Sequence, residues 1–224
     1  MVALACDRVP ADHVAGLDLV DNEVFPKIMG ETELSRKAFF LAKAIPKLQE
    51  SFNVIEKCPK PVIAAVHGAC IGGGIDMLSA CDIRFCTQDA WFQIKEVDVG
   101  LAADLGTLQR FPKIVGNDSL VRELTYTARK FYSDEAKSIG FVSRVLLDKE
   151  QMLRAALDTA IVIASKSPIA VQGSKVNLVY SRDHGVNDGL DYISKWNLAM
   201  LQSDDVMKAA GAMMSKSKPV FSKL

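Results

Sequence analysis

The chain has 224 residues, enough to bury the core of one domain, and its 27 basic residues balance its 27 acidic ones. No basic stripe stands out, so nucleic acid is not expected as a partner, and no apolar run approaches the length that spans a bilayer. We therefore expect a single domain over residues 1–224, without a membrane span.

The N-terminal quarter carries two apolar runs and one long segment with helical periodicity. Residues 2–6 (VALAC) predict a short strand, and residues 32–57 carry apolar side chains at helical spacing, with a kink expected at Pro46. Residues 61–66 (PVIAAV) are a continuous apolar run between proline and glycine. Such a run is typical of a strand that is buried on both faces.

The next segment combines a glycine triplet with two short apolar runs. Gly72–Gly74 are expected to open a short helix, and strands are predicted at 83–87 and 91–94. Residues 95–104 (KEVDVGLAAD) have the composition of a loop. Asp104 is expected to act as the N-cap of a helix that follows it.

The C-terminal half is mostly helical in its pattern. Further elements are predicted as helices at 118–130 and 133–138 and a strand at 142–146. Residues 149–214 are expected to be mostly helix, with breaks at Pro168 and at 181–185 (SRDHG). Strands in the first part and helices at the end indicate an α/β protein with a helical C-terminal part.

The segment HGACIGGGID (67–76) raises the question of what three consecutive glycines contribute, because each loses more backbone freedom on folding than other residues do. A strand, a glycine turn and a helix would leave free N–H groups at the helix start. These groups could cradle a phosphate or form an oxyanion hole, and the alternative is close packing of helix and sheet. The spacing matches neither the dinucleotide-binding pattern nor the P-loop pattern.

Three acids follow the triplet, and each has a structural alternative to a chemical role. Asp76 could complement the helix dipole, Glu96 could be a solvated acid paired with Lys95 or Arg110, and Asp104 could be only an N-cap. Their sequence surroundings are apolar, however, and a carboxyl group in apolar surroundings titrates abnormally. We therefore treat all three as candidate acids or bases.

Four segments resemble the crotonase, or enoyl-CoA hydratase/isomerase, superfamily. They are AGLDL (15–19), KPVIAAVHGACIGGGIDMLSACDIRFC (60–86), EVDVGL (96–101) and LGTLQR (105–110). The resemblance runs from about residue 15 to the C-terminus, and the central block is highly specific. It implies a ββα spiral core, about residues 1–146, and a helical C-terminal region, about 147–224, that builds trimers commonly stacked into hexamers.

The resemblance also implies how a substrate is held. The family binds acyl-CoA thioesters and fixes the thioester oxygen with two backbone amides. By position, these amides belong to Leu17, within the loop Ala15-Gly16-Leu17-Asp18-Leu19, and to Gly73 in the triplet. The glycines would then expose an amide to which an enolate oxygen comes close, and such donors supply several kcal/mol of transition-state stabilisation.

The acids imply which reaction follows. Hydratases of the family have acids at the positions of Asp76 and Glu96, the first normally a glutamate, and generally a glycine at that of Asp104. The trio here resembles the dienoyl-CoA isomerase branch, which converts 3,5-dienoyl-CoA to 2,4-dienoyl-CoA in fatty acid beta-oxidation. We expect Glu96 to serve C2, Asp104 to serve C6 and Asp76 to be a supporting carboxyl, with the swapped assignment of Glu96 and Asp104 left open.

Two other readings stay open. One is an enoyl-CoA hydratase that uses Asp76 and Glu96. The other is a non-catalytic acyl-CoA-binding subunit, because the strand hairpin and helix that precede AGLDL in the family are not found, so the fold is expected to be N-terminally shortened. The basic residues Lys175, Arg182 and Lys195 indicate a solvated helix face rather than a clamp for the CoA phosphates.

The remaining expectations concern cofactors, partners and cell compartment. Five cysteines without a CxxC pair and three scattered histidines predict no metal site, and no cofactor is expected beyond the CoA that the substrate carries. Ser222-Lys223-Leu224 matches the address read by the peroxisomal import receptor. A mitochondrial form is expected only with a longer N-terminus, and a homotrimer or homohexamer is the expected assembly.

Overall fold

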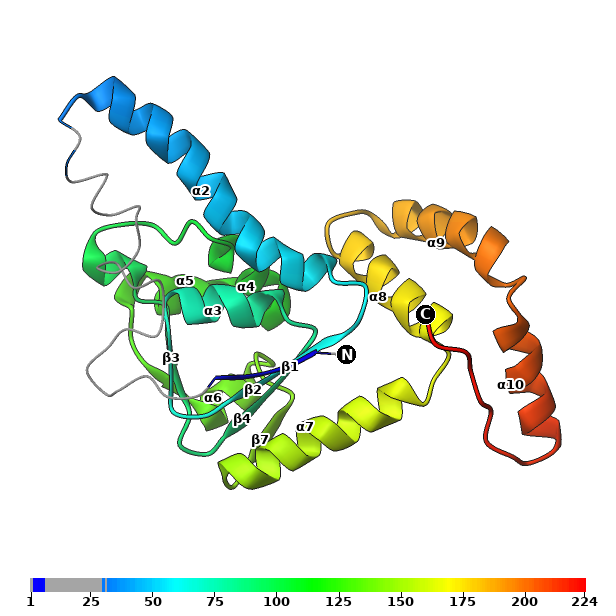
Figure 1. The fold of residues 1–224 in the computed structure, drawn as a ribbon. Helices are drawn as coiled ribbons and strands as arrows, with labels where there is room; N and C mark the ends of the chain where they lie inside the picture. The colour runs from blue at the N-terminus through cyan, green and yellow to red at the C-terminus, as the bar shows by residue number, and fades with distance from the viewer. Residues whose placement is uncertain (1, 7–29, 31) are drawn as a thin grey trace.

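A four-stranded parallel sheet organises the part of the chain that the computed structural model describes, residues 2–6, 30 and 32–224 (Figure 1). Its strands lie in the order β1 (Val2–Cys6), β2 (Val62–Val66), β4 (Ile83–Thr87) and β7 (Arg144–Leu146). Each neighbouring pair is parallel. The sequence predicts all four strands, and β7 begins two residues later than expected. The α/β class is therefore confirmed.

A second, three-stranded sheet consists of β3 (Ala69–Ile71), β5 (Trp91–Gln93) and β6 (Phe131–Tyr132). β3 pairs with β5 in parallel, and β5 pairs with β6 in the antiparallel sense. Only β5 is predicted from the sequence, because strands of two or three residues are too short to show an alternating pattern.

The sequence predicts a helix over 118–130, but the predicted C-terminal end is three residues too late. α5 (Asp118–Thr127) ends where Ala128 adopts a left-handed conformation with φ 48°. The chain then pairs with β5 through β6 instead of continuing as a helix.

β2 is buried on both faces, as its apolar run predicts. Val62, Ala64 and Val66 belong to one hydrophobic cluster, whereas the alternate residues Ile63 and Ala65 belong to another. The first cluster also takes in residues of α3 (Gly73–Ala80), α4 (Thr107–Val115), α5 and α6 (Ser133–Ser138). The second is closed by α7 (Lys149–Ala164), which contacts all four strands of the sheet. Helices thus cover both faces, as expected for a parallel sheet.

Four phenylalanines fill the centre of the first cluster. Phe92, Phe111, Phe131 and Phe141 are each fully buried, and the centroids of rings in contact lie 4.9–6.1 Å apart. Because these rings come from β5, α4, β6 and the segment before β7, they lock the second sheet and α4 together. This packing fixes the positions of the turns that carry the candidate site.

α2 (Leu34–Lys57) is one long helix that continues through Pro46. Its N-terminal half extends away from the sheets, whereas its C-terminal half lies beside α3 and α4 (Figure 1). Glu33 caps the helix by accepting hydrogen bonds from the backbone N–H groups of Ser35 and Arg36. The C-terminal half of α2 therefore faces the segment that carries Asp104.

Three helices follow α7: α8 (Pro168–Arg182), α9 (Val186–Met200) and α10 (Asp204–Met214). The predicted breaks at Pro168 and at 181–185 are confirmed, with Ser167 as the N-cap of α8 and Pro168 at its first position. A third break at 201–203 is not predicted, because no glycine or proline marks it. Figure 1 shows these helices to one side of the sheets, and none of the described helices has the length and apolarity to cross a membrane.

Candidate active site

The glycine triplet forms the turn between β3 and α3. Gly72 adopts φ 53° and ψ −119°, its N–H donates to the Gln93 carbonyl at 3.0 Å, and helix α3 begins at Gly73. Within the described chain the Gly73 N–H donates no hydrogen bond, as expected for the first residue of a helix. The strand–turn–helix arrangement predicted around the triplet is present, although the preceding strand is the unpredicted β3.

Glu96 lies against this turn. It is the first residue of the short 3-10 helix η1 (Glu96–Val99), which occupies part of the predicted loop 95–104. A Cβ atom added to Gly72 would lie 3.3 Å from Glu96 Oε1. Glu96 Oε2 is buried, and no group in the described ranges hydrogen-bonds to it. The absence of a side chain at Gly72 therefore makes room for the carboxyl group of Glu96.

The surroundings of Glu96 favour its protonated form. Burial raises the pKa of Glu96, and the negative charges of Asp76 and Asp104 raise it further. Hydrogen bonds from the backbone at Glu96 and Lys95 oppose this shift only in part. A carboxyl group with a raised pKa is suited to exchanging protons with a substrate near neutral pH.

Asp76 lies inside α3 and is 1% exposed. Its Oδ1 accepts two hydrogen bonds from Thr107, one from the backbone N–H at 2.6 Å and one from the hydroxyl at 2.8 Å. Burial raises the pKa of Asp76 despite these bonds, and the charge of Asp104 adds to the rise. Asp76 thus holds the start of α4, and its role as a supporting carboxyl stays a prediction.

The sequence predicts that Asp104 is the N-cap of the following helix, and this prediction is wrong. α4 begins at Thr107, its N-cap position is Gly106, and the acceptor for the Thr107 N–H is Asp76. The prediction fails because a carboxylate from another helix takes the capping role. Asp104 is thereby left exposed in the segment before α4.

Asp104 lines a polar cavity of about 480 Å³ together with Asn53, Glu56, Arg110 and Arg182. Neither Gly73 nor Glu96 lines this cavity, so the three groups do not share one described pocket. They are nevertheless coupled electrically, since the charge of Asp104 raises the pKa values of both Asp76 and Glu96. The placement of Asp104 along an acyl chain stays a prediction.

The loop that would supply the second oxyanion donor lies outside the described residues. This applies to Ala15, Gly16, Leu17, Asp18 and Leu19. Gly73 is therefore the one predicted oxyanion donor whose position the structure describes.

A buried ionic network lies behind Asp104. Arg110 of α4, 7% exposed, donates to Asn53 Oδ1 at 2.6 Å and to both carboxylate oxygens of Glu56 at 3.3–3.4 Å. Arg182 of α8 also donates to Glu56. Burial alone would raise the pKa of Glu56, but the hydrogen bonds from Arg182 and Arg110 outweigh burial and lower it. α2, α4 and α8 are thus joined at one carboxylate.

Thr107 and the pair Glu56–Arg110 were not singled out as functional from the sequence. Thr107 carries no clear local signal, because it is the first residue of α4 rather than its N-cap and its hydroxyl donates to Asp76 of another helix. The contact between Glu56 and Arg110 spans 54 positions of the chain and has no local signature. Only the fold brings these groups together.

Two of the basic residues considered for the CoA phosphates, Lys175 and Lys195, differ in their exposure to solvent. Lys195 is solvated and pairs with Asp191, as expected for a helix face. Lys175 is not solvated: it is 5% exposed and its Nζ donates to Asp82 Oδ2 at 2.7 Å and to two backbone carbonyls. The expectation of a solvated face is wrong for Lys175, because α8 packs this side chain onto the core.

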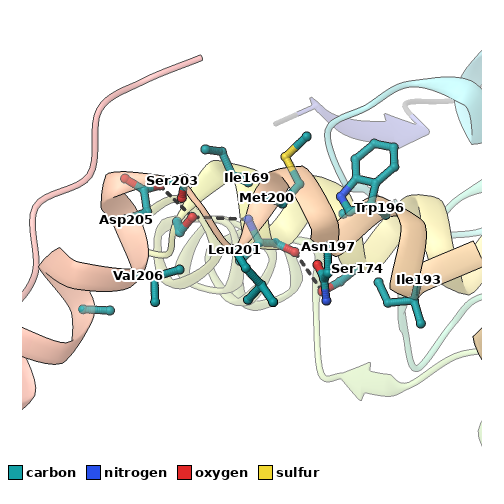
Figure 2. A pocket seen from close by; sticks show the side chains of 14 residues that line it. Ile169, Ser174, Ile193, Trp196, Asn197, Met200, Leu201, Ser203, Asp205 and Val206 are labelled. Carbon is teal, nitrogen blue, oxygen red and sulfur yellow. Dashed lines mark hydrogen bonds between the residues drawn. The ribbon is translucent and has the colours of Figure 1, made fainter.

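A second cavity, of about 460 Å³, lies between α8, α9 and α10 (Figure 2). Its lining is mainly apolar and includes Ile169, Trp196 and Met200. Trp196 packs on α8 at Gly173, where an added Cβ atom would lie 2.7 Å from the indole Nε1. None of Asp76, Glu96 and Asp104 lines this cavity. Within the described residues, no group of three or more His, Cys, Asp or Glu side chains could hold a metal ion.

Several proteins with similar sequences are named as Δ3,5-Δ2,4-dienoyl-CoA isomerases. The chain is 59% identical over 213 residues to the mitochondrial Δ3,5-Δ2,4-dienoyl-CoA isomerase of Rattus norvegicus. The alignment covers 94% of this chain and 65% of the rat protein. The chain is 47% identical to the peroxisomal Δ3,5-Δ2,4-dienoyl-CoA isomerase of Arabidopsis thaliana, with 94% of this chain and 76% of that protein covered. The chain thus spans just under two thirds of the rat protein.

The fold and a family model agree with these relatives. The crystal structure of an enoyl-CoA hydratase from Bacillus anthracis superposes with a TM-score of 0.77 at 26% identity, covering 88% of this chain and 73% of that one. The architecture is therefore the crotonase fold. The family model for enoyl-CoA hydratase/isomerase matches residues 29–223. With most of its length matched, the chain belongs to the enoyl-CoA hydratase/isomerase family.

Proposed function

We propose that this chain isomerises 3,5-dienoyl-CoA to 2,4-dienoyl-CoA, a step of fatty acid beta-oxidation. The observation that carries the proposal is the carboxyl group of Glu96 packed against the glycine turn that opens the helix at Gly73, with its pKa raised by burial and by the charges of Asp76 and Asp104. The identity of 59% to the rat protein named as this isomerase supports it.

The chemistry is a proton transfer along the acyl chain. Glu96 takes a proton from C2, and the C2–H electrons move toward the thioester carbonyl, giving an extended dienolate with negative charge on the thioester oxygen. The Gly73 N–H, with Leu17 as the second donor, would stabilise this charge. Asp104 then supplies a proton to C6: the enolate electrons return to form the C2–C3 double bond, the C3–C4 double bond moves to C4–C5, and the C5–C6 electrons form the new C6–H bond.

Asp76 supports this reaction without touching the substrate. Its negative charge raises the pKa of Glu96, and it orders the start of α4 through Thr107. No metal ion or redox cofactor takes part in the proposed steps, because the thioester itself acidifies C2. Dialysis against a chelator should therefore leave turnover unchanged.

The proposal is tested by adding 3,5-dienoyl-CoA and following the absorbance of the conjugated 2,4-dienoyl product. Asp104→Asn should lower kcat by about 100-fold or more, the usual contribution of a general acid or base. Asp183→Asn is the matched control, because Asp183 lines the same cavity but has no assigned role. Unchanged turnover in Asp104→Asn would remove Asp104 from the reaction. Addition of water to 2-enoyl-CoA, without isomerisation, would identify a hydratase instead.

We also propose that the protein is imported into peroxisomes and that it forms a homotrimer or homohexamer. Ser222, Lys223 and Leu224 are exposed, as a receptor-read signal must be. Exposed apolar side chains such as Leu178 and Val186 on the C-terminal helices support self-association. Sedimentation would give the oligomeric state, and removal of Leu224 should abolish peroxisomal targeting of the full chain in cells.

A further inference from the structure

The burial of Arg110 on α4 is not explained by its ion pair with Glu56 alone. Its guanidinium is fixed from one side by α2, through Asn53 Oδ1 at 2.6 Å and the carboxylate of Glu56 at 3.3–3.4 Å. Since Arg182 donates to the same carboxylate, Glu56 would keep a cationic partner without Arg110. Neutralising Glu56 therefore does not by itself account for a buried arginine on α4.

The other side of the guanidinium lies against the segment that carries Asp104. Gly106 adopts φ 134°, and a Cβ atom added there would clash with Arg110 Nη1. The backbone two residues after Asp104 is therefore packed directly on the arginine. Only glycine allows this approach, because any side chain would occupy the space of the guanidinium.

A second contact fixes the same segment from α2. Gln49 Nε2 donates to the backbone carbonyl of Asp104 at 2.7 Å. Gln49, Asn53 and Glu56 lie on one face of α2, four and three residues apart, so a single rigid helix supports both Arg110 and the Asp104 carbonyl. Within the described residues the exposed side chain of Asp104 forms no hydrogen bond or ion pair, so the placement of Asp104 depends on this backbone support.

The charges are consistent with this arrangement. Arg110 lowers the pKa of Asp76 and Asp104 raises it, although burial remains the largest influence on Asp76. Arg110 and Asp104 thus both lie within electrostatic range of the same buried acid.

We propose that Arg110, anchored by Glu56 and Asn53 of α2, is a positioning residue that holds the Asp104 segment in place for proton transfer at one carbon of the acyl chain. The inference rests on the proposed isomerase function. It distinguishes Asp104, supported by Arg110 and Gln49, from Glu96, which is placed by the glycine turn. Replacing Arg110 should therefore slow the proton transfer that Asp104 performs and leave the proton transfer that Glu96 performs unchanged.

The test separates the two carbons by hydrogen exchange in D₂O. Exchange at C2 is measured on recovered 3,5-dienoyl-CoA, and exchange at C6 on recovered 2,4-dienoyl-CoA. Asp104→Asn and Glu96→Gln establish which carbon each acid serves. Arg110→Gln should lose exchange by about 10- to 100-fold at the carbon that Asp104→Asn affects, as expected for a displaced reactive group, and keep it at the other.

Gln49→Ala provides a second variant that removes no buried charge. It should show the same carbon selectivity as Arg110→Gln with a smaller loss. Its matched control is Gln202→Ala, since Gln202 Nε2 also donates to a backbone carbonyl, that of Leu198, far from Asp104. Arg154→Gln, which removes an exposed arginine paired with Glu150, is the control for Arg110→Gln.

Each outcome decides the proposal. If Arg110→Gln and Gln49→Ala reduce exchange equally at both carbons, or at neither, Arg110 is a structural residue only and the inference is wrong. If Arg110→Gln does not fold, the carbon selectivity of Gln49→Ala decides. Absence of turnover in the unmodified protein would instead overturn the proposed function, so the two failures are distinguishable.

Discussion

The carboxylate of Asp76 on α3 caps the N-terminus of α4 by accepting hydrogen bonds from both the backbone N–H and the hydroxyl of Thr107. The two residues are 31 positions apart, so this cap joins two helices rather than ending one. A buried acid is thereby kept at a helix N-terminus, where the helix dipole favours negative charge. The cap fixes where the segment with Asp104 must enter α4.

Replacing Thr107 by valine tests this cap. Thr107→Val keeps the shape but removes the hydroxyl donor, and we expect the free energy of unfolding to fall by about 1–3 kcal/mol, as for a lost hydrogen bond to a charged or buried acceptor. The pKa of Asp76 should rise further, since one of the bonds that lowers it is gone. Denaturant titration measures the first effect. Thr159→Val, which loses only a hydroxyl bond to the Ala155 carbonyl, should change stability less.

Glu96→Gln should separate stability from activity. Because burial raises the pKa of Glu96 above 4.5, the folded state binds this proton more tightly than the unfolded state does. The contribution of Glu96 to stability is therefore fully present below pH 4.5 and is lost as the pH rises through the folded pKa. Glutamine lacks this loss, so the variant should melt at a higher temperature than the wild type at neutral pH while turnover is abolished.

The control for Glu96→Gln is Glu150→Gln, which alters an exposed pair on α7 and should leave both the melting temperature and turnover unchanged. A lower melting temperature for Glu96→Gln at neutral pH would contradict the assigned direction of the pKa shift.

Gly72→Ala should damage the site directly. The backbone at Gly72, with φ 53°, disfavours any side chain, and the new Cβ would lie 3.3 Å from Glu96 Oε1. We expect a stability loss of about 1–3 kcal/mol, typical of a strained residue, together with reduced turnover from a displaced carboxyl group. Gly211→Ala is the control, because it lies in a helix with nothing within 4 Å of the added Cβ and should be neutral or stabilising.

Lys175→Met should destabilise the attachment of α8. Its loss removes the hydrogen bonds from Lys175 to Asp82 and to two backbone carbonyls, and the cost should be about 1–3 kcal/mol, because Asp82 contacts solvent and keeps the hydrogen bond from the Val62 N–H. Thermal unfolding measures the change. Lys195→Met removes an exposed lysine paired with Asp191 and should shift the free energy of unfolding by less than about 0.5 kcal/mol.

The sequence predicts the long elements and the chemistry-bearing residue types better than the contacts between them. β2 and α7 carry patterns long enough to interpret, whereas β3 and β6, with three and two residues, exist only because β5 pairs with them. The assignment of Asp104 as an N-cap failed for a similar reason. A local rule found an acid before a helix, but the acceptor comes from Asp76, which no local pattern could indicate.

Two salt bridges that join α8 to the core have a consequence for protein engineering. Lys175 and Arg182 are two helical turns apart and reach Asp82 and Glu56 on separate elements of the core, so ionic partners set the register of α8 at two points. A chimera that grafts α8, α9 and α10 of another family member onto this core would need basic residues at the positions of Lys175 and Arg182 to pair with Asp82 and Glu56. Without them, the graft would dock with unmatched charge at both points.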